Sequence, residues 1–323
     1  MLFDETFSKC FELSNDIPKA IQYEDFWVYH YTSPDGFMNI IQNNGKAKLW
    51  FTQYDSLNDV NERKAFEEFF KEYCGRKKKE KAFPAVFISR ITPMSGSDVC
   101  GITRWTDERL LLEDGTESPV VHARQAECDT YLCCFSSDPD SLAMWNYYSK
   151  TGHYEGYNVC LEADSLESNS GFGKGFSLRL VKVVYEDDEK EKILDQLLEP
   201  LAELFSKEDE HGRKNILSTV QSVINHLQFS FKNQCFAHEK EIRAILRVPR
   251  ANKDNEKVFE RKYRQKNGFI IPYIEFPLKS GIVKGATMAP LIREEVALKN
   301  AQDFLRSRGH AAKVTASQIP IRF

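Results

Sequence analysis

The stretch Thr130–Glu162, TYLCCFSSDPDSLAMWNYYSKTGHYEGYNVCLE, decides the fold expected for this chain. Tyr131–Phe135 is a continuous apolar run, typical of a strand that is buried on both faces. Ser136–Asp140 interrupts this run, because proline fixes φ and small polar residues favour turns and helix caps. A short helical stretch rich in aromatic residues follows, and Tyr157–Leu161 then resumes a strand pattern. The stretch therefore predicts two strands joined by a turn and a short helix.

The aromatic residues of this short helix allow two interpretations. Met144, Tyr147 and Tyr148 share one side of the helix, since residues three and four positions apart lie on the same face, and Trp145 lies at its edge. Rings beside a turn and nearby glycines are suited to a pocket for a flat ring. The alternative is that the same rings form part of the core, as most aromatic stripes at helical spacing do.

The bulk composition describes an ordinary globular protein. The chain has 323 residues, of which 41% are hydrophobic and 28% charged, with a net charge of −4. This length exceeds that of a usual single domain, yet one elaborated domain over residues 1–323 accommodates it. A net negative charge excludes nucleic-acid binding that depends on bulk positive charge alone.

The sequence predicts a cytoplasmic protein without a membrane partner. Acidic residues interrupt the apolar pattern of the first 16 residues, and no apolar run approaches the roughly 18 residues needed to cross a bilayer. The eight cysteines are scattered and include no C-x-x-C pair, so we expect reduced, mostly buried thiols and no structural metal. These cysteines are Cys10, Cys74, Cys100, Cys128, Cys133, Cys134, Cys160 and Cys235.

The pattern along the rest of the chain predicts an α+β fold, with a mixed, largely antiparallel twisted sheet and attached helices. Few strand–helix–strand repeats occur, which argues against a doubly wound parallel sheet. Leucine and isoleucine repeat at helical spacing over residues 189–232, which predicts a two-helix excursion. Residues 76–128 are interpreted as an insertion that contains one strand, Ala85–Ser89. The other predicted strands are Phe26–Tyr31, Lys48–Gln53, Ser177–Tyr185, Glu239–Val248, Gly268–Phe276, Gly281–Met288 and Ala311–Thr315.

Polar side chains concentrate at the ends of three of these predicted elements. They are His30-Tyr31-Thr32, the segment from Ser136 to Tyr148, and the segment from His238 to Arg243. In the last segment, strand alternation places Glu239, Glu241 and Arg243 on one face. Two carboxylates on one face can stabilise an oxocarbenium-like sugar cation, as in glycoside cleavage. The alternative is a solvent-facing strand with alternating ion pairs.

Other catalytic templates are absent from the sequence. There is no G-x-x-x-x-G-K-[ST], no G-x-G-x-x-G after a strand, no G-x-S-x-G and no H-E-x-x-H. Asp59 and Glu62 are acidic residues near the start of a predicted helix and are candidates for a metal-dependent nuclease site. Such a site needs converging carboxylates around Mg²⁺.

The chain resembles a large bacterial family of unknown function from about Tyr29 to Arg322. The residues that carry this resemblance are His30-Tyr31-Thr32, Leu57-Asn58-Asp59 with Glu62, Cys134-Phe135-Ser136 followed by Met144-Trp145 and Tyr148, and Glu239-x-Glu241-x-Arg243. The combination of these motifs in this order is specific, whereas each motif alone is not.

The same pattern is remotely similar to the His-Tyr-Glu class of ADP-ribosyltransferase folds. That resemblance implies that His30 anchors the adenosine ribose of NAD and that Tyr147 or Tyr148 stacks on nicotinamide. It also implies that Glu241 is the catalytic acid and that Glu239 orients an acceptor. Tyr31, Ser136 and Arg243 complete the set of residues that we expect at the NAD site.

The leading hypothesis from the sequence is therefore an ADP-ribosyltransferase or NAD glycohydrolase, in the manner of a bacterial toxin or phage-defence effector. NAD is then the substrate, and water, a protein or a nucleic acid is the acceptor. One alternative is a non-catalytic module that binds a nucleotide or a protein. A third hypothesis is the metal-dependent nuclease that uses Asp59 and Glu62.

Overall fold

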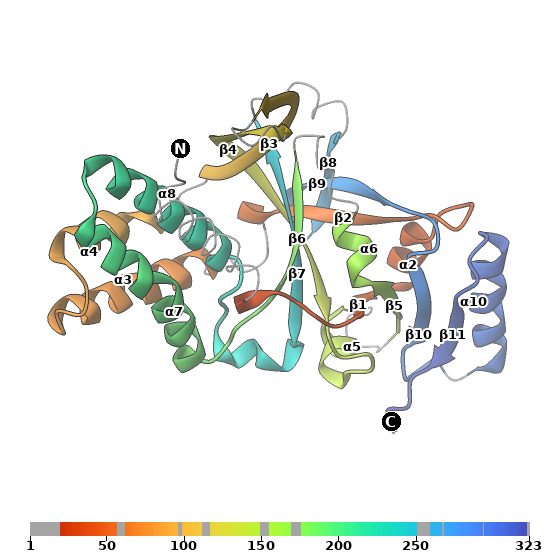
Figure 1. Cartoon of the computed structure of the whole chain (residues 1–323). Helices are drawn as coiled ribbons and strands as arrows, with labels where there is room; N and C mark the ends of the chain where they lie inside the picture. The colour runs from red at the N-terminus through yellow and green to blue at the C-terminus, as the bar shows by residue number, and fades with distance from the viewer. Residues whose placement is uncertain are drawn as a thin grey trace.

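The computed structural model describes residues 20–56, 62–95, 99–111, 117–148, 155–168, 176–250, 259–266, 268–292 and 294–321, without the side chains of 62–63, 99–127, 249 and 266. Figure 1 shows a central sheet with one group of helices beside β6 and β7 and other helices near β1, β2 and β5. The predicted segment Leu57–Asp59 lies outside the described residues.

The strands form one large, mostly antiparallel sheet, which confirms the predicted α+β class. The order along its main path is β11-β10-β5-β1-β4-β2-β9-β8, with β3 and β7 also paired to β4, and β6 paired to β7. Only β10 and β11 pair in parallel among these strands. The bounds are β1 Trp27–Thr32, β2 Ala47–Gln53, β3 Val99–Leu111, β4 Glu117–Ser136, β5 Tyr157–Glu162, β6 Ser177–Lys182, β7 Glu241–Pro249, β8 Arg261–Lys266, β9 Phe269–Leu278, β10 Val283–Met288 and β11 Lys313–Ala316.

One edge of β4 serves two different strands. Leu132 faces Thr52 of β2, and Ser136 faces Tyr29 of β1. The other edge of β4 is occupied by β7 along Cys128–Ser136. It follows that β1 and β2 leave the same edge of β4 and diverge, as Figure 1 also shows. We call Cys133–Phe135, the part of β4 between the two points of pairing, the fork.

The helices and short 3₁₀ turns connect and cover the strands. The helices are α2 Pro34–Ile40, α3 Glu62–Lys79, α4 Ala85–Ile91, α5 Leu142–Tyr148, α6 Ala163–Glu167, α7 Asp187–Lys207, α8 Glu210–Leu227 and α10 Glu295–Ser307. The 3₁₀ turns are η1 Tyr54–Ser56, η2 Thr92–Met94 and η3 Gln234–Glu239. Helices α7 and α8 occupy the segment that the sequence predicts as a two-helix excursion.

Helices α3, α4, α7 and α8 form a helical layer with a core of its own, which appears at the left of Figure 1. This core also contains Leu132 and Ile245, so the layer packs on the β4–β7 part of the sheet. Ion pairs add to it, such as that of Lys77 with Asp195 at 2.7 Å. Residues 76–95 are therefore packed against the predicted excursion.

The strand expected at Ala85–Ser89 is wrong, because this segment is the start of α4. Its buried residues are Phe87, Ile88 and Ile91, which follow helical spacing toward the helical core. A short apolar run has no periodicity of its own that separates a strand from a buried helix. Pro84, in the cap position, is a residue typical of a helix start.

A second core lies on the opposite face of β4 and β7. Tyr131, Cys133 and Phe135 of β4 contribute to it, together with Ile242 and Ala244 of β7. Alternation along the strands therefore directs Cys134, Ser136, Glu241 and Arg243 away from this core. The fork thus separates two environments, one apolar and one that carries charged groups.

The cysteines are not all reduced, and the described helices include none that could span a membrane. Cys128 is disulfide-bonded, so the expectation that all cysteines are reduced is wrong for this residue. Cys74, Cys133, Cys134, Cys160 and Cys235 are free. In the described parts of the chain, every helix is too short or too polar to cross a bilayer.

We predict that the helical core contributes strongly to stability. Leu198 of α7 has no exposed surface, so Leu198→Ala should lower the free energy of unfolding by about 2–5 kcal/mol through lost burial and a cavity. Chemical denaturation followed by circular dichroism measures this change. Glu203→Ala on the exposed face of α7 is the control and should change it by less than about 0.5 kcal/mol. Equal effects of the two changes would contradict the packing described above.

Candidate active site at the fork of the sheet

Two glutamates, one lysine and one arginine form a buried charge cluster at the end of β7. Lys232 Nζ lies 2.7 Å from Glu239 Oε2 and 2.9 Å from Glu241 Oε2. Arg243 holds Glu241 with two bonds, from Nε to Oε1 at 2.8 Å and from Nη2 to Oε2 at 3.0 Å. Residue exposure is between 1% and 9% for all four. Four charges that sum to zero are thus removed from water together.

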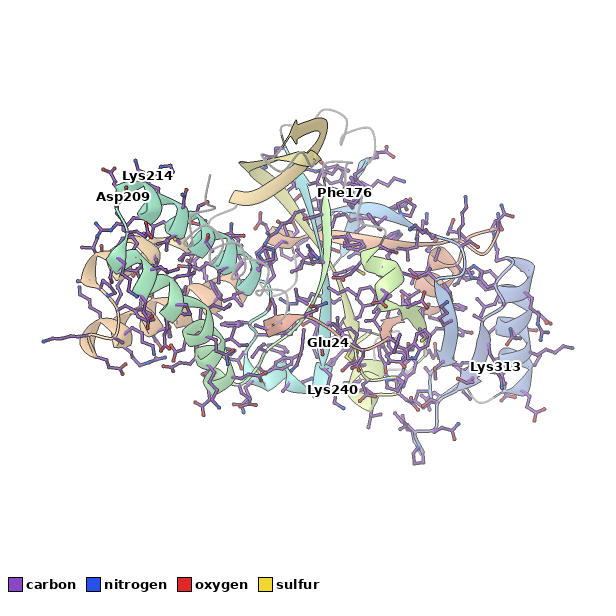
Figure 2. The ribbon with its side chains drawn as sticks, viewed as in Figure 1. Glu24, Phe176, Asp209, Lys214, Lys240 and Lys313 are labelled. Carbon is purple, nitrogen blue, oxygen red and sulfur yellow. The ribbon has the colours of Figure 1, made fainter. Side chains whose placement is uncertain are left out.

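The chain reverses between the two glutamates. Glu239 is the last residue of η3, Glu241 is the first residue of β7, and Lys240 between them has the left-handed conformation, with φ of 44°. The predicted simple alternation over Glu239–Arg243 is therefore wrong at Glu239. The carboxylates still meet, because Lys232 joins them. Figure 2 labels Lys240 at the end of β7 that is closest to α5.

Glu241 has its acceptor capacity filled by protein donors. It receives hydrogen bonds from Arg243 and Lys232, and the thiol of Cys134 adds another. A carboxylate offers about four lone-pair sites. Burial acts to raise the pKa of Glu241, but the charge and hydrogen bonds of Arg243, with Lys232 and Cys134, lower it to about 2. Glu241 is therefore a fixed, ionised group with little capacity for a further donor.

Glu239 is engaged through fewer contacts. Its Oε2 accepts from Lys232, and its backbone carbonyl accepts from the hydroxyl of Ser136 at 2.8 Å. Among the described residues, Oε1 of Glu239 has no recorded hydrogen bond. Of the two glutamates, Glu239 therefore has the carboxylate oxygen that is available to a ligand.

Cys134 links the charge cluster to His30 on β1. Its backbone carbonyl accepts from His30 Nδ1 at 2.9 Å, and its thiol donates to the Glu241 carboxylate. Burial and the neighbouring charge of Glu241 raise the pKa of this thiol well above its ordinary value, so it stays protonated. The fork thus brings His30 and Glu241 to the two sides of one residue.

The hydrogen bond to Cys134 fixes the tautomer of His30. A carbonyl oxygen only accepts, so Nδ1 carries the proton and Nε2 is an acceptor in the neutral ring. Burial lowers the pKa of His30, the carbonyl of Cys134 raises it, and the charge of Arg264 lowers it further. The net lowering keeps the ring neutral near pH 7. The imidazole ring of His30 also makes an edge-to-face contact with the ring of Phe135, with ring centroids 5.6 Å apart.

The two candidate stacking tyrosines differ in position. Tyr148 is 40% exposed, yet it lies close enough to the cluster that, after partial burial, the charges of Glu239 and Glu241 raise its pKa. Tyr147 is 56% exposed, and its ring lies 5.4 Å from that of His238. Only Tyr148 is therefore brought to the charge cluster, while Tyr147 lies at the surface beside η3.

Ser136 and Tyr31 support the loop that borders the cluster. Besides its bond to Glu239, Ser136 Oγ accepts from the backbone N–H of Asp138 at 3.1 Å. Tyr31 is buried, donates to the carbonyl of Asp138 at 2.8 Å and accepts from the N–H of Ser141 at 2.9 Å. Both hydroxyls therefore donate to one backbone carbonyl and accept from one backbone N–H, so that each fixes the backbone of this loop.

Asp140 connects the same loop to the C-terminal segment. Its Oδ1 accepts from Trp145 Nε1 and from Ser317 Oγ, each at 2.7 Å, and its Oδ2 accepts from the N–H of Gln318 at 2.8 Å. Trp145 is fully buried. The loop that follows Ser136 is therefore bonded to Trp145 of α5 and to the segment at Ser317 and Gln318, which lies far away in sequence.

Sequence reasoning missed Lys232, Asp140 and the linking role of Cys134. Lys232 follows Phe229-Ser230-Phe231 and is separated from the glutamates by a short turn, so no spacing rule marks it. No local signal marks the role of Asp140, because its partners Ser317 and Gln318 lie 177 and 178 positions away. The position of Cys134 on the open edge of β4 follows only from the strand pairing.

One cavity lies away from the charge cluster. A cavity of about 380 Å³ borders the C-terminal segment and is lined by Ala289, Pro290, Ile292, Ala316, Ser317, Ile319, Pro320 and Ile321, none of which is a predicted site residue. No group of three or more potential metal ligands occurs among the described residues. Asp59 and the side chain of Glu62, the residues of the nuclease hypothesis, lie outside that part of the chain.

Glu241→Gln should destabilise the fold, because it leaves Arg243 buried without its full charge partner. We expect a loss of about 3–5 kcal/mol at pH 7, as for other broken buried ion pairs. Since its folded pKa is lowered to about 2, the contribution of Glu241 is present above its unfolded pKa near 4.5 and is lost as the pH falls toward 2. Urea denaturation at pH 7 and pH 3 measures this. A variant as stable as the native protein at pH 7 would contradict the role of Glu241 in holding the cluster.

Comparison with known proteins adds a family match over the centre of the chain. Residues 144–244 match the model of a family described as "Protein of unknown function (DUF2971)". Searches of curated proteins and of solved structures give no match. The matched segment runs from α5 to β7 and contains Tyr148, Lys232, Glu239, Glu241 and Arg243. The part of the chain that carries the charge cluster therefore resembles a family of unknown function.

Proposed function

We propose that the protein binds NAD at the fork and cleaves its nicotinamide–ribose bond, as an NAD glycohydrolase or an ADP-ribosyltransferase. The observation that carries this proposal is the link through Cys134, which joins His30 on one side to the Glu241 cluster on the other. In this proposal His30 accepts from a sugar hydroxyl, and the glutamates stabilise the sugar cation.

His30 is suited to hold a ribose. Its Nδ1 is occupied by Cys134, so the neutral ring offers Nε2 as an acceptor for a hydroxyl donor. The lowered pKa keeps this acceptor available at neutral pH. A ribose hydroxyl supplies the matching donor.

Glu239 and Glu241 have different roles in this proposal. Glu239 has the carboxylate oxygen that is available to a ligand, so it contacts the ribose whose bond is broken. Glu241 is saturated and positions Lys232 and Cys134. This assignment moves to Glu239 the catalytic role that the resemblance gave to Glu241, and it gives neither glutamate the orientation of the acceptor.

The chemistry follows from the positive charge that develops on the sugar. The bond between C1′ and the nicotinamide nitrogen breaks, its electron pair leaves with nicotinamide, and an oxocarbenium-like ribose forms. An anionic carboxylate beside that cation lowers the energy of the transition state. Water or an acceptor nucleophile then bonds to C1′ and releases one proton. Tyr148, next to the cluster, is the ring that stacks on nicotinamide in this proposal.

The test is nicotinamide release from NAD by the purified protein, with and without cell extract. We expect Glu239→Gln to reduce release by about 100-fold or more, because it removes the anion beside the cation. This variant should fold, since Lys232 keeps Glu241 as its partner. The matched control is Glu275→Gln on β9, where a half-buried glutamate pairs with Lys48 and Lys262, and its rate should stay within twofold of native.

The proposal is wrong if the folded native protein releases no nicotinamide and does not bind NAD in calorimetry. NAD binding without nicotinamide release would instead support a non-catalytic nucleotide-binding module. The saturation of Glu241 by protein donors is the observation that favours this second candidate, because a filled carboxylate is typical of a structural ion pair.

A further inference from the structure

Arg264 of β8 has an unusual position for a charged residue. Its guanidinium carbon lies 5.4 Å from the ring centroid of Trp50 and 5.7 Å from that of Tyr273, and Nη2 donates to Thr52 Oγ1 at 2.8 Å. Its Nε is buried and has no hydrogen-bond partner. The two rings and the Thr52 hydroxyl thus hold the guanidinium in one orientation, in which the buried Nε–H donates to no acceptor.

No carboxylate neutralises Arg264 among the residues that the structure describes. Nearby arginines differ, because Arg250 and Arg261 both pair with Asp129 at 2.8 Å. Burial lowers the pKa of Arg264, which reflects the cost of keeping this cation out of water. A buried N–H without a partner is costly, so its presence needs a reason.

The position of Arg264 is close to the fork. Its contact Thr52 pairs with Leu132, the residue that precedes the fork on β4. Burial lowers the pKa of His30 and raises that of Cys133, and in both groups the charge of Arg264 acts to lower the pKa. Arg264 therefore approaches the fork from the β2 side, while His30 approaches it from β1.

The edge of a guanidinium formed by Nε and Nη2 is suited to an anion with two oxygens. The protein itself provides an example, because Arg243 uses these two atoms to hold both oxygens of Glu241. In Arg264 the same edge has an unused Nε and an Nη2 that contacts only the Thr52 hydroxyl. A phosphate oxygen would satisfy Nε and replace the missing counter-charge.

We infer that Arg264 binds a phosphate group of a nucleotide whose ribose is held by His30. The inference rests on the proposed function in taking NAD as the ligand, and it assigns the pyrophosphate of NAD to the β2 side of the fork. Trp50 and Tyr273 position the guanidinium and do not contact the ligand in this assignment.

Calorimetric binding of ADP and of adenosine tests the inference without requiring turnover. We expect Arg264→Gln to weaken ADP binding by at least 10-fold and to change adenosine binding by less than twofold. The matched control is Arg261→Gln on the same strand, whose partners are Asp129 and Tyr131, and it should leave both affinities within twofold. Thermal melting confirms that each variant is folded.

A second measurement does not depend on any ligand. Because Arg264 lowers the pKa of His30, Arg264→Gln should raise that pKa in an NMR titration, whereas Arg261→Gln should leave it unchanged. An unchanged His30 pKa in Arg264→Gln would overturn the placement of Arg264 at the fork.

The possible results separate the inference from the proposed function. Equal ADP affinity in the native protein and Arg264→Gln overturns the inference, as does ADP binding no tighter than adenosine binding. Turnover of NAD that depends on Glu239 would leave the proposed function standing in either case. ADP binding that depends on Arg264, with no release of nicotinamide from NAD, supports the inference and overturns the proposed enzyme activity.

Discussion

The arrangement of this molecule depends on one edge of β4 that has to satisfy two strands. β2 pairs with it at Tyr131 and Leu132, and β1 pairs with it at Ser136. Backbone groups between these points need another partner, since a buried carbonyl without a hydrogen bond is costly. His30 supplies that partner for Cys134. A side chain thus replaces a strand at the fork, and this substitution places a titratable ring against the backbone of Cys134.

The charge cluster is stable only as a set. Moving two carboxylates and two cations out of water carries a large desolvation cost, which mutual contacts at 2.7–3.0 Å offset. Lys232 is the shared member, and its backbone N–H bonds to Val184 O at 3.1 Å, next to the sheet. Its position therefore depends on where the helical excursion returns to the strands. The helical layer is in this sense part of the site, although none of its helices contributes a charge to the cluster.

Sequence patterns predicted the sheet well but only part of the site. Alternation placed Glu241 and Arg243 on one face of β7, and the leucine and isoleucine spacing identified α7 and α8, because both signals are local. Ala85–Ser89 was misassigned since a short apolar run fits a helix or a strand. The joining of Lys232 to both glutamates, and of Cys134 to His30, depends on tertiary pairing and on the left-handed Lys240, which no local pattern specifies.

The bond between Asp140 and Ser317 has a consequence for how the chain acquires its structure during synthesis. The two residues are 177 positions apart, and Asp140 also bonds to Gln318. Contacts of such long sequence separation form late, because closing a long loop costs entropy. On the ribosome, the loop after β4 has to wait for Ser317 and Gln318 to emerge before its aspartate has all its partners. The nascent protein therefore cannot complete this loop while only the segment around β4 has been synthesised.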